Sequence, residues 1–360
     1  MSAARDVIAV FGATGYTGRL VAEELHRCGV PLLLAGRDRA RLAALAKTLG
    51  GAEVLVARVD EPHSLDRLAA RAVVLVNCVG PFVDLGEPVV RAAIAAGAHY
   101  VDSTGEQPFV QAMQVHDSWA RAQGVAVIPA LAFEIALADC AAALAARGLD
   151  VVERVQITYA TRLHASQGTK RSALRMLQEG GCAFVDGAWV AEPPGLHLAQ
   201  VEVPPRGRVA ALSFPGAEVI TVPRHVDART VRTFMSMPGL TARLLSAGAT
   251  WLPVLARSPL GTLATGWLGA GTEGPDAATR RRDGFDLVVE AHGSRAGMAV
   301  SRRLVLHGRD PYGLTAAIIR QGVLWLAAGA ARAHGVLAPA MAFDPQRLLD
   351  GLAADGVSIA

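Results

Sequence analysis

The chain has 360 residues, of which 52% are hydrophobic and 19% are charged. These values predict about two packed domains with a sizeable core, and they exclude a disordered chain. The formal net charge of +3 is small and dispersed, which argues against a nucleic-acid partner. Mean hydropathy is high, at +0.32. The most apolar stretch, residues 244–271, is nevertheless interrupted by prolines and an arginine, so it lacks a transmembrane span of about 20 residues.

The N-terminal residues carry charges and lead directly into an apolar strand, unlike a secretory signal. Cys28, Cys78, Cys140 and Cys182 are widely spaced and form no CxxC pair, which indicates neither a metal site nor a disulfide framework. We therefore expect a cytoplasmic protein with reduced thiols. Peripheral membrane contact through residues 244–270 and a homodimer are left open.

Short apolar runs alternate with helical segments in the first half of the chain. The expected strands are residues 6–11, 31–35, 53–59, 72–79, 99–102 and 125–129, and the helices between them include 19–27, 39–49 and 86–96. Continuous apolar runs of this length are typical of a parallel sheet covered on both faces. The pattern predicts a doubly wound Rossmann domain over residues 1–138.

After about residue 150, apolar and polar residues alternate in longer strands, as in antiparallel sheets with one solvated face. The expected strands are residues 152–160, 197–203, 209–214, 231–237, 285–291 and 298–306, with helices at 170–179, 240–255, 314–333 and 346–354. The predicted fold class is α/β, with the Rossmann domain followed by an α+β domain that has a mainly antiparallel sheet, over residues 139–334. Residues 335–360 would form a tail that packs back on the Rossmann domain.

A glycine-rich turn follows the first expected strand and opens a helix. It reads Gly12, Ala13, Thr14, Gly15, Tyr16, Thr17 and Gly18. The first glycine permits a tight turn, the second lets the backbone approach a pyrophosphate, and the third lets the helix pack closely on the strand. Free N–H groups and the helix dipole then face the phosphates. The turn predicts a dinucleotide-binding site.

Gly36 and Arg37 follow the second expected strand, at the place where an NAD enzyme usually carries a carboxylate for the ribose diol. Arg37, with Arg39 and Arg41 near it, can pair with a 2′-phosphate through charge-assisted hydrogen bonds. Asp38 is an alternative acceptor for a ribose hydroxyl, but the balance favours NADP as the cofactor. Asp60, after the third strand, would either accept from the adenine amine or cap the next helix.

Residues that follow the fourth and fifth expected strands would lie at the ligand crevice, since the carboxyl ends of parallel strands line it. Gly80 and Pro81 should therefore border the middle of the cofactor and the nicotinamide. Cys78 is interpreted as a small buried core residue. Asp102 and Glu106 would lie where a substrate approaches the nicotinamide ring, or would cap the next helix.

Three segments together resemble the saccharopine dehydrogenase-like reductase family: GATGYTGRLVAEEL, LAGRDRARL and VLVNCVGPFVDLGEPVVRAAIAAGAHYVDSTGE. Residues 271–275 with Arg281 and Phe285, residues 310–312 and residues 335–340 are similar to the trans-acting enoyl reductase branch of that family. The resemblance implies that Gly12, Gly15, Gly18 and Arg37 bind the cofactor. It also implies reduction of a C=N or C=C bond with NADPH.

One segment departs from the family pattern Gly-Phe-Asp-Ser-x-Pro-x-Asp. Phe133 and Asp139 match it, whereas Ala132 and Glu134 replace Gly and Asp, and the Ser and Pro are absent. No substrate of lysine metabolism is therefore carried over from the family. A saccharopine-type enzyme would also need a basic cluster, for which the chain offers Arg162, Lys170 and Arg171.

The sequence excludes the short-chain dehydrogenase mechanism, which needs a Tyr-x-x-x-Lys pair. The residues four positions after the four tyrosines are Leu20, Thr104, Leu163 and Ala316. Hydride transfer then depends on orientation, with a proton from a side chain or water. The catalytic residues are left unassigned, since each proton-donor candidate also has an ordinary structural role. These candidates are Tyr159, His164, Tyr312 and Glu134.

We expect an NADP-dependent oxidoreductase that reduces the C=C bond of a small apolar or acyl substrate, as the resemblance implies. Two alternatives remain. One is a non-catalytic dinucleotide sensor, and the other is a saccharopine-type amino-acid reductase acting on a C=N bond.

Overall fold

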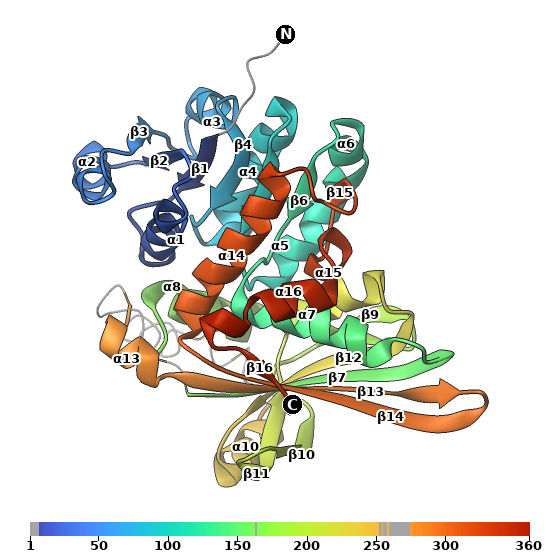
Figure 1. Cartoon of the computed structure of the whole chain (residues 1–360). Coiled ribbons are helices and arrows are strands. Elements are labelled where there is room, and N and C mark those ends of the chain that lie inside the picture. Colours follow the sequence, from blue (N-terminus) through green and yellow to red (C-terminus); the bar gives the residue numbers. More distant parts are fainter. Residues whose placement is uncertain (1–6, 163, 252–253, 255–257, 259–273) are drawn as a thin grey trace. The chain divides into compact units, whose positions relative to one another are not determined.

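The computed structural model describes residues 7–162, 164–251, 254, 258 and 274–360. It divides into two compact units, each built from separate segments of the chain (Figure 1). Unit 1 consists of Met1–Thr104, Phe109–Ala136 and Tyr312–Gly351, and unit 2 of Gly105–Pro108, Leu137–Pro311 and Leu352–Ala360. The expected boundaries were residues 138 and 334, with the tail 335–360 on the Rossmann domain. Here Tyr312–Gly351 lies in unit 1 and Leu352–Ala360 in unit 2.

Unit 1 is built on a seven-stranded sheet in the order β15-β6-β5-β4-β1-β2-β3, and all of its strand pairs are parallel. The strands are β1 (Val7–Phe11), β2 (Leu32–Gly36), β3 (Glu53–Val56), β4 (Ala72–Asn77), β5 (His99–Asp102), β6 (Ala126–Ile128) and β15 (Gly335–Val336). The order runs outward in both directions from β1, as in a doubly wound Rossmann fold. The predicted fold of this part is confirmed.

Strand β15 comes from the C-terminal region and extends the sheet beyond β6. The N–H groups of Gly335 and Leu337 donate to the carbonyls of Val125 and Val127, at 2.9 and 2.8 Å. The Asp117 carboxylate also accepts from the N–H of Val336 at 2.9 Å. The red β15 lies beside β6 in Figure 1. The sheet of unit 1 is therefore completed by a segment from the far end of the sequence.

The helices that contribute to unit 1 mostly begin and end near the expected positions. They are α1 (Tyr16–Arg27), α2 (Arg39–Thr48), α3 (Pro62–Ala69), α4 (Phe82–Ala96), α5 (Gln107–Ala112), α6 (Asp117–Ala122), α7 (Phe133–Ala146), α14 (Pro311–Ala327), α15 (Pro339–Ala342) and α16 (Pro345–Gly351). Helices α5, α7 and α14 cross the division between the units. Their apolar faces bury a core that includes Phe11, Leu33, Leu75, Tyr100 and Val127.

Helix α4 begins at Phe82, four residues before the expected start at residue 86. Gly86 lies inside the helix because the Phe109 ring packs against it, and a Cβ atom there would lie 2.4 Å from the ring. Glycine has a low helix propensity, but a larger residue at this position would leave no room for the Phe109 ring.

Unit 2 contains a nine-stranded sheet whose main path is β10-β11-β12-β7-β13-β14-β16. Its strands are β7 (Val151–Arg162), β8 (Gly181–Val185), β9 (Ala188–Glu192), β10 (Leu198–Val203), β11 (Gly207–Ser213), β12 (Ala228–Ser236), β13 (Gly284–Arg295), β14 (Met298–Arg309) and β16 (Ser358–Ile359). The pair β12–β7 is parallel, and the other described pairs are antiparallel. The predicted α+β domain with a mainly antiparallel sheet is confirmed.

The hairpin formed by β8 and β9 was not expected from the sequence. It turns at Asp186 and Gly187, whose φ values of +50° and +80° match the type I′ turn that Asp-Gly favours. The Asp-Gly pair between two apolar runs was therefore an available indication. The strands β15 and β16, of two residues each, carry no such indication.

The helices of unit 2 include α8 (Gln167–Glu179), α9 (Glu218–Thr221), α10 (Gly239–Ala247) and α13 (Ala277–Arg282). Helix α10 covers the first part of the expected helix 240–255. Most of the apolar stretch 244–271 and the resemblance segment at residues 271–273 lie outside the described residues. Within the described residues, no helix is long and apolar enough to cross a membrane.

Candidate functional site

The glycine turn of unit 1 fits against the ends of two strands so closely that side chains are excluded. Gly12 has a φ of +81°, and a Cβ atom there would lie 2.8 Å from Cγ2 of Val79. The N–H of Gly12 donates to the Ala35 carbonyl at 2.9 Å, which fixes the turn to the end of β2. A Cβ atom at Gly18 would lie 2.2 Å from the Gly12 carbonyl oxygen. The spacing of the glycines is therefore a geometric requirement of this turn.

The N-terminus of helix α1 is open to an anion. The N-cap residue is Gly15, which has no side chain to occupy the N–H groups of the first turn. That first turn also contains no acidic residue. Since the first N–H groups of a helix have no partner within the helix and carry its positive dipole end, they suit a pyrophosphate.

Two arginines and a capping aspartate follow β2. The Asp38 carboxylate accepts from the backbone N–H of Arg41 at 3.0 Å and caps helix α2. Its position therefore has a structural role, and this weakens its alternative role as a ribose acceptor. The Arg41 guanidinium donates to the Thr14 carbonyl at 2.9 Å, directly on the glycine turn. Arg37 is exposed at the end of β2. These two guanidinium groups provide the positive charge that a 2′-phosphate requires.

Of these two arginines, Arg41 was noted in the sequence only as a neighbour of Arg37. Arg39 is exposed in the first turn of α2. The structure thus adds Arg41 to the candidate cofactor residues.

The other predicted cofactor residues lie farther along the sheet edge. Asp60 is exposed and its carboxylate is held by Arg58 at 3.0 Å, and that hydrogen bond lowers the pKa of Asp60. The N-cap of the following helix α3 is Glu61. Gly80 is exposed after β4, and Pro81 is the N-cap of α4. Their contacts with a cofactor stay predictions.

Comparison with known proteins identifies this arrangement. Residues 8–128 match the family model described as the saccharopine dehydrogenase NADP binding domain. The chain is similar to this family over these residues, which make up about a third of its length. The match confirms the family resemblance and the choice of NADP as cofactor, and the exposed Arg37 with Arg41 at the end of β2 fits that cofactor.

Relatives of the NADP-binding domain differ in their names. A Mycobacterium tuberculosis protein named as a trans-acting enoyl reductase is 37% identical over 139 residues, which cover 37% of this chain and 33% of that protein. A human saccharopine dehydrogenase-like oxidoreductase is 37% identical over 151 residues, which cover 37% of this chain and 35% of that protein. The matched region thus spans about a third of these relatives.

One solved structure resembles the whole chain in fold. The L-glutamate-forming saccharopine dehydrogenase of Saccharomyces cerevisiae has a TM-score of 0.68 and 13% sequence identity, and the match covers 99% of both chains. At this identity the likeness concerns the fold alone.

Asp102 of the NADP-binding domain has a structural role rather than an exposed position facing a substrate. The residue is fully buried at the end of β5, where its Oδ1 atom accepts from the N–H groups of Thr104 at 2.9 Å and Ala130 at 2.8 Å. Asp102 and burial together raise the pKa of Tyr100 well above its usual range. Asp102 therefore fixes the loops that follow β5 and β6. Glu106, its companion in the sequence analysis, is buried in unit 2 and accepts from the Ser172 hydroxyl at 3.0 Å.

The two candidate proton donors in unit 2 are both engaged. The Tyr159 hydroxyl, on β7, donates to the buried carboxylate of Glu218. His164 is held by Asp283, with 2.6 Å between Nδ1 and Oδ1 and 2.9 Å between the His164 N–H and Oδ2. Buried Asp283 thus fixes the ring orientation of an exposed histidine.

The other two candidate donors belong to unit 1, together with the NADP-binding domain. Tyr312 packs edge-to-face against Tyr16 of the glycine turn, with 5.1 Å between ring centroids. Glu134 is half-buried in the first turn of α7, and burial raises the pKa of its carboxyl group to about 7. These two residues are the candidates that the fold brings to the cofactor unit.

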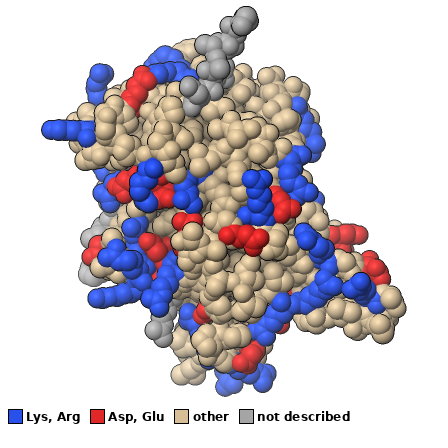
Figure 2. Space-filling view, viewed as in Figure 1, with Lys and Arg blue, Asp and Glu red and all other residues tan. Residues whose placement is uncertain are grey.

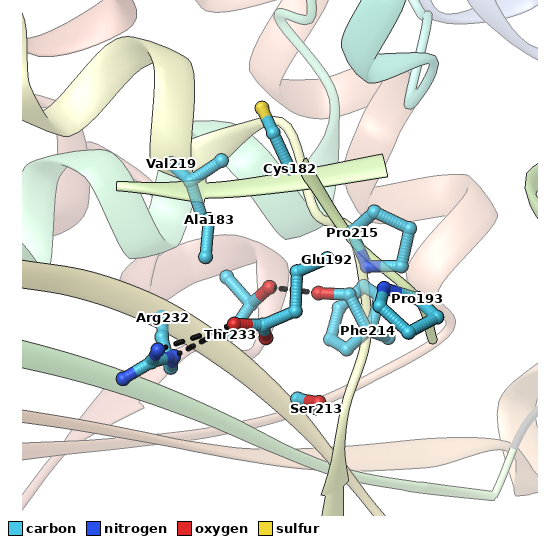
Figure 3. Close-up of a pocket in the computed structure, with 10 residues that line it drawn as sticks. All are labelled: Cys182, Ala183, Glu192, Pro193, Ser213, Phe214, Pro215, Val219, Arg232 and Thr233. Carbon is cyan, nitrogen blue, oxygen red and sulfur yellow. Dashed lines mark hydrogen bonds and ion pairs between the residues drawn. The ribbon is translucent and has the colours of Figure 1, made fainter. Parts of the chain in front are cut away.

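Unit 2 contains a small pocket of about 230 Å³ including its mouth (Figure 3). Arg232 and Glu192 pair within it at 3.1 Å, and Nε2 of His197 contacts the same carboxylate oxygen at 3.0 Å. The Thr233 hydroxyl donates to the Phe214 carbonyl. Because these polar groups bind one another, we assign the pocket no ligand.

On the face of the molecule shown in Figure 2, basic and acidic side chains are interspersed.

We expect the four cysteines to differ sharply in reactivity. Cys28 is exposed and Cys140 is buried. Burial raises the pKa of Cys78 to about 12 and that of Cys182 to about 11, so both thiols stay protonated near neutral pH. Titration of the folded protein with a chromogenic disulfide should show prompt reaction of Cys28 alone, and Cys28→Ser should remove it. Prompt reaction of a second thiol in that variant would contradict this prediction.

Proposed function

We propose that the protein is an NADPH-dependent reductase that adds hydride to the C=C bond of a small apolar or acyl substrate in the cytoplasm. The observation that carries the proposal is the glycine turn at the open end of α1, with Arg37 and Arg41 beside it. The enoyl reductase name of the M. tuberculosis relative supports the choice of a C=C bond. The match covers 37% of this chain and 33% of that relative, so the substrate is a proposal for this chain.

The residues of unit 1 fit NADPH in charge and in space. The N–H groups of residues 16–18, in the first turn of α1, would bind the pyrophosphate. The flanking glycines leave the backbone of this turn without side chains in the way. The guanidinium groups of Arg37 and Arg41 would hold the 2′-phosphate, and Gly80 and Pro81 would border the nicotinamide. When bound, NADPH supplies a hydride from C4 of the nicotinamide.

A binding experiment tests the first part of the proposal. NADPH at 100 times its dissociation constant should stabilise the folded protein by about 2.7 kcal/mol, which raises its melting temperature by several degrees. NADH at the same concentration should raise the melting temperature less, because it lacks the 2′-phosphate. Absence of a shift at saturating NADPH would contradict the proposal.

A turnover experiment tests the second part. NADPH absorbance should decrease when a 2-enoyl thioester is added and should stay constant with the saturated thioester of the same length. Binding of NADPH without turnover of any C=C substrate would instead favour the non-catalytic sensor. Turnover of an imine formed from an amino acid would favour the saccharopine-type alternative.

A further inference from the structure

Glu134 lies at the carboxyl end of the parallel sheet, where the candidate cofactor site is formed. It belongs to the first turn of α7, which follows β6 after a short loop. The strands of this sheet are parallel, so the carboxyl ends of β1, β4, β5 and β6 all lie at the same end of the sheet. The glycine turn follows β1 at that end of the sheet. In doubly wound sheets the ligand binds there.

The loop before Glu134 is held in one conformation. The N–H of Ala130 donates to the Asp102 carboxylate at 2.8 Å, and the N–H of Leu131 donates to the Asp102 carbonyl at 2.9 Å. Ala130 has a φ of +63°, a conformation that costs a non-glycine residue about 1–3 kcal/mol. Such strain persists where neighbouring contacts impose it, and it is concentrated at functional sites.

One turn of helix α14 connects the start of α7 to the glycine turn. The Thr315 hydroxyl oxygen accepts from the N–H of Phe133, next to Glu134, at 3.2 Å. Tyr312, three residues earlier and on the same helix face, packs against Tyr16 at 5.1 Å with an interplanar angle of 87°. A helical turn rises only about 5 Å. The backbone that carries Glu134 is therefore held close to the backbone that binds the cofactor.

The environment of Glu134 allows it to carry a proton near neutral pH. Burial raises the pKa of its carboxyl group from 4.5 to about 7, against a smaller opposing effect of its own backbone N–H. None of the ionisable groups on the elements that hold this loop contributes to that shift; they are His99, Tyr100 and Asp102 on β5, and Tyr312 and Arg320 on α14. A side chain that is still partly exposed and titrates near neutral pH can both give a proton to a substrate and regain it from water.

We propose that Glu134 is the catalytic acid of the reductase, an assignment that rests on the proposed function. As one carbon of the C=C bond gains the hydride, the π electron pair moves to the other carbon. The Glu134 O–H then gives its proton to that second carbon, so a C–H bond forms at each end. NADP⁺ and the Glu134 carboxylate are left, and water returns the proton to the carboxylate.

The test replaces Glu134 with glutamine, which keeps the shape of the side chain and removes the acidic proton. We expect kcat for the enoyl thioester to fall about 100-fold or more, with the NADPH dissociation constant unchanged. The wild-type rate should fall as pH rises above about 7, because the acid form is required. Glu134→Asp should keep this pH dependence at a lower rate, whereas Glu134→Gln should lose it.

A stability measurement shows whether the titrating group is the one proposed. An acid with a raised pKa in the folded state makes the free energy of unfolding fall as pH rises, here between 4.5 and about 7. Glu134→Gln should lose this fall, and the partly exposed control Glu23→Gln should keep it. Turnover by Glu134→Gln at the wild-type rate and pH profile would overturn the assignment. Absence of turnover in the wild type would instead contradict the proposed function.

Discussion

Replacement of Gly18 with alanine should destabilise the NADP-binding domain and abolish detectable NADPH binding. The added Cβ would lie 2.2 Å from the carbonyl oxygen of Gly12, 2.8 Å from its carbon and 3.1 Å from Cα of Ala13. All three are backbone atoms, so no side chain can rotate away. Overpacking of this kind typically costs about 1–3 kcal/mol, and displacement of the turn would also misplace the N–H groups that receive the pyrophosphate.

Denaturant unfolding and NADPH titration would measure both effects. Gly168→Ala is the matched control, because Gly168 also lies in the first turn of a helix, α8. Among the described residues, its added Cβ would meet only the Ser166 hydroxyl, at 3.8 Å. That control should be neutral or more stable by about 0.5–1 kcal/mol. If Gly18→Ala bound NADPH like the wild type, the account of the turn given above would be wrong.

Replacement of Arg37 with alanine should weaken NADPH binding by about 1.5–3 kcal/mol, or roughly 10- to 150-fold, and should leave NADH binding nearly unchanged. The reason is that an exposed guanidinium at the end of β2 has the 2′-phosphate as its expected partner, and NADH lacks that group. Calorimetric titration with the two cofactors gives both dissociation constants. An equal loss for the two cofactors would show that Arg37 does not contact the 2′-phosphate.

Two neighbouring arginines make this experiment specific. Arg41→Ala removes the hydrogen bond to the Thr14 carbonyl as well as a positive charge, so it should weaken binding of both NADPH and NADH. Arg39→Ala removes an exposed charge from the same helix turn and should change neither constant by more than about twofold. The three variants together separate recognition of the 2′-phosphate from support of the glycine turn.

Local patterns were sufficient to predict much of unit 1. Each strand from β1 to β6 corresponds to a short apolar run in the sequence. The glycine spacing indicates the turn, because the residues that must lack a side chain there all lie within seven positions. The type of cofactor could also be predicted, since Arg37 directly follows its strand.

Features that depend on distant contacts could not be predicted in this way. The packing of the Phe109 ring against Gly86, inside α4, is one example. The bracing role of Asp102 depends on the loop after β6, and the contact of Arg41 depends on Thr14 across 27 residues. Glu134 was one of four equal candidates in the sequence, because its burial and the support from Thr315 exist only in the folded chain.

The pairing of β15 with β6 also affects how the protein is synthesised. Residues 335–336 leave the ribosome long after β1 to β6, so the edge of β6 stays without its partner while almost all of unit 2 is being made. An unpaired strand edge is a site for improper association between nascent chains. Unit 1 is therefore the first of the two units to emerge from the ribosome, although its sheet can be completed only when the chain is nearly finished.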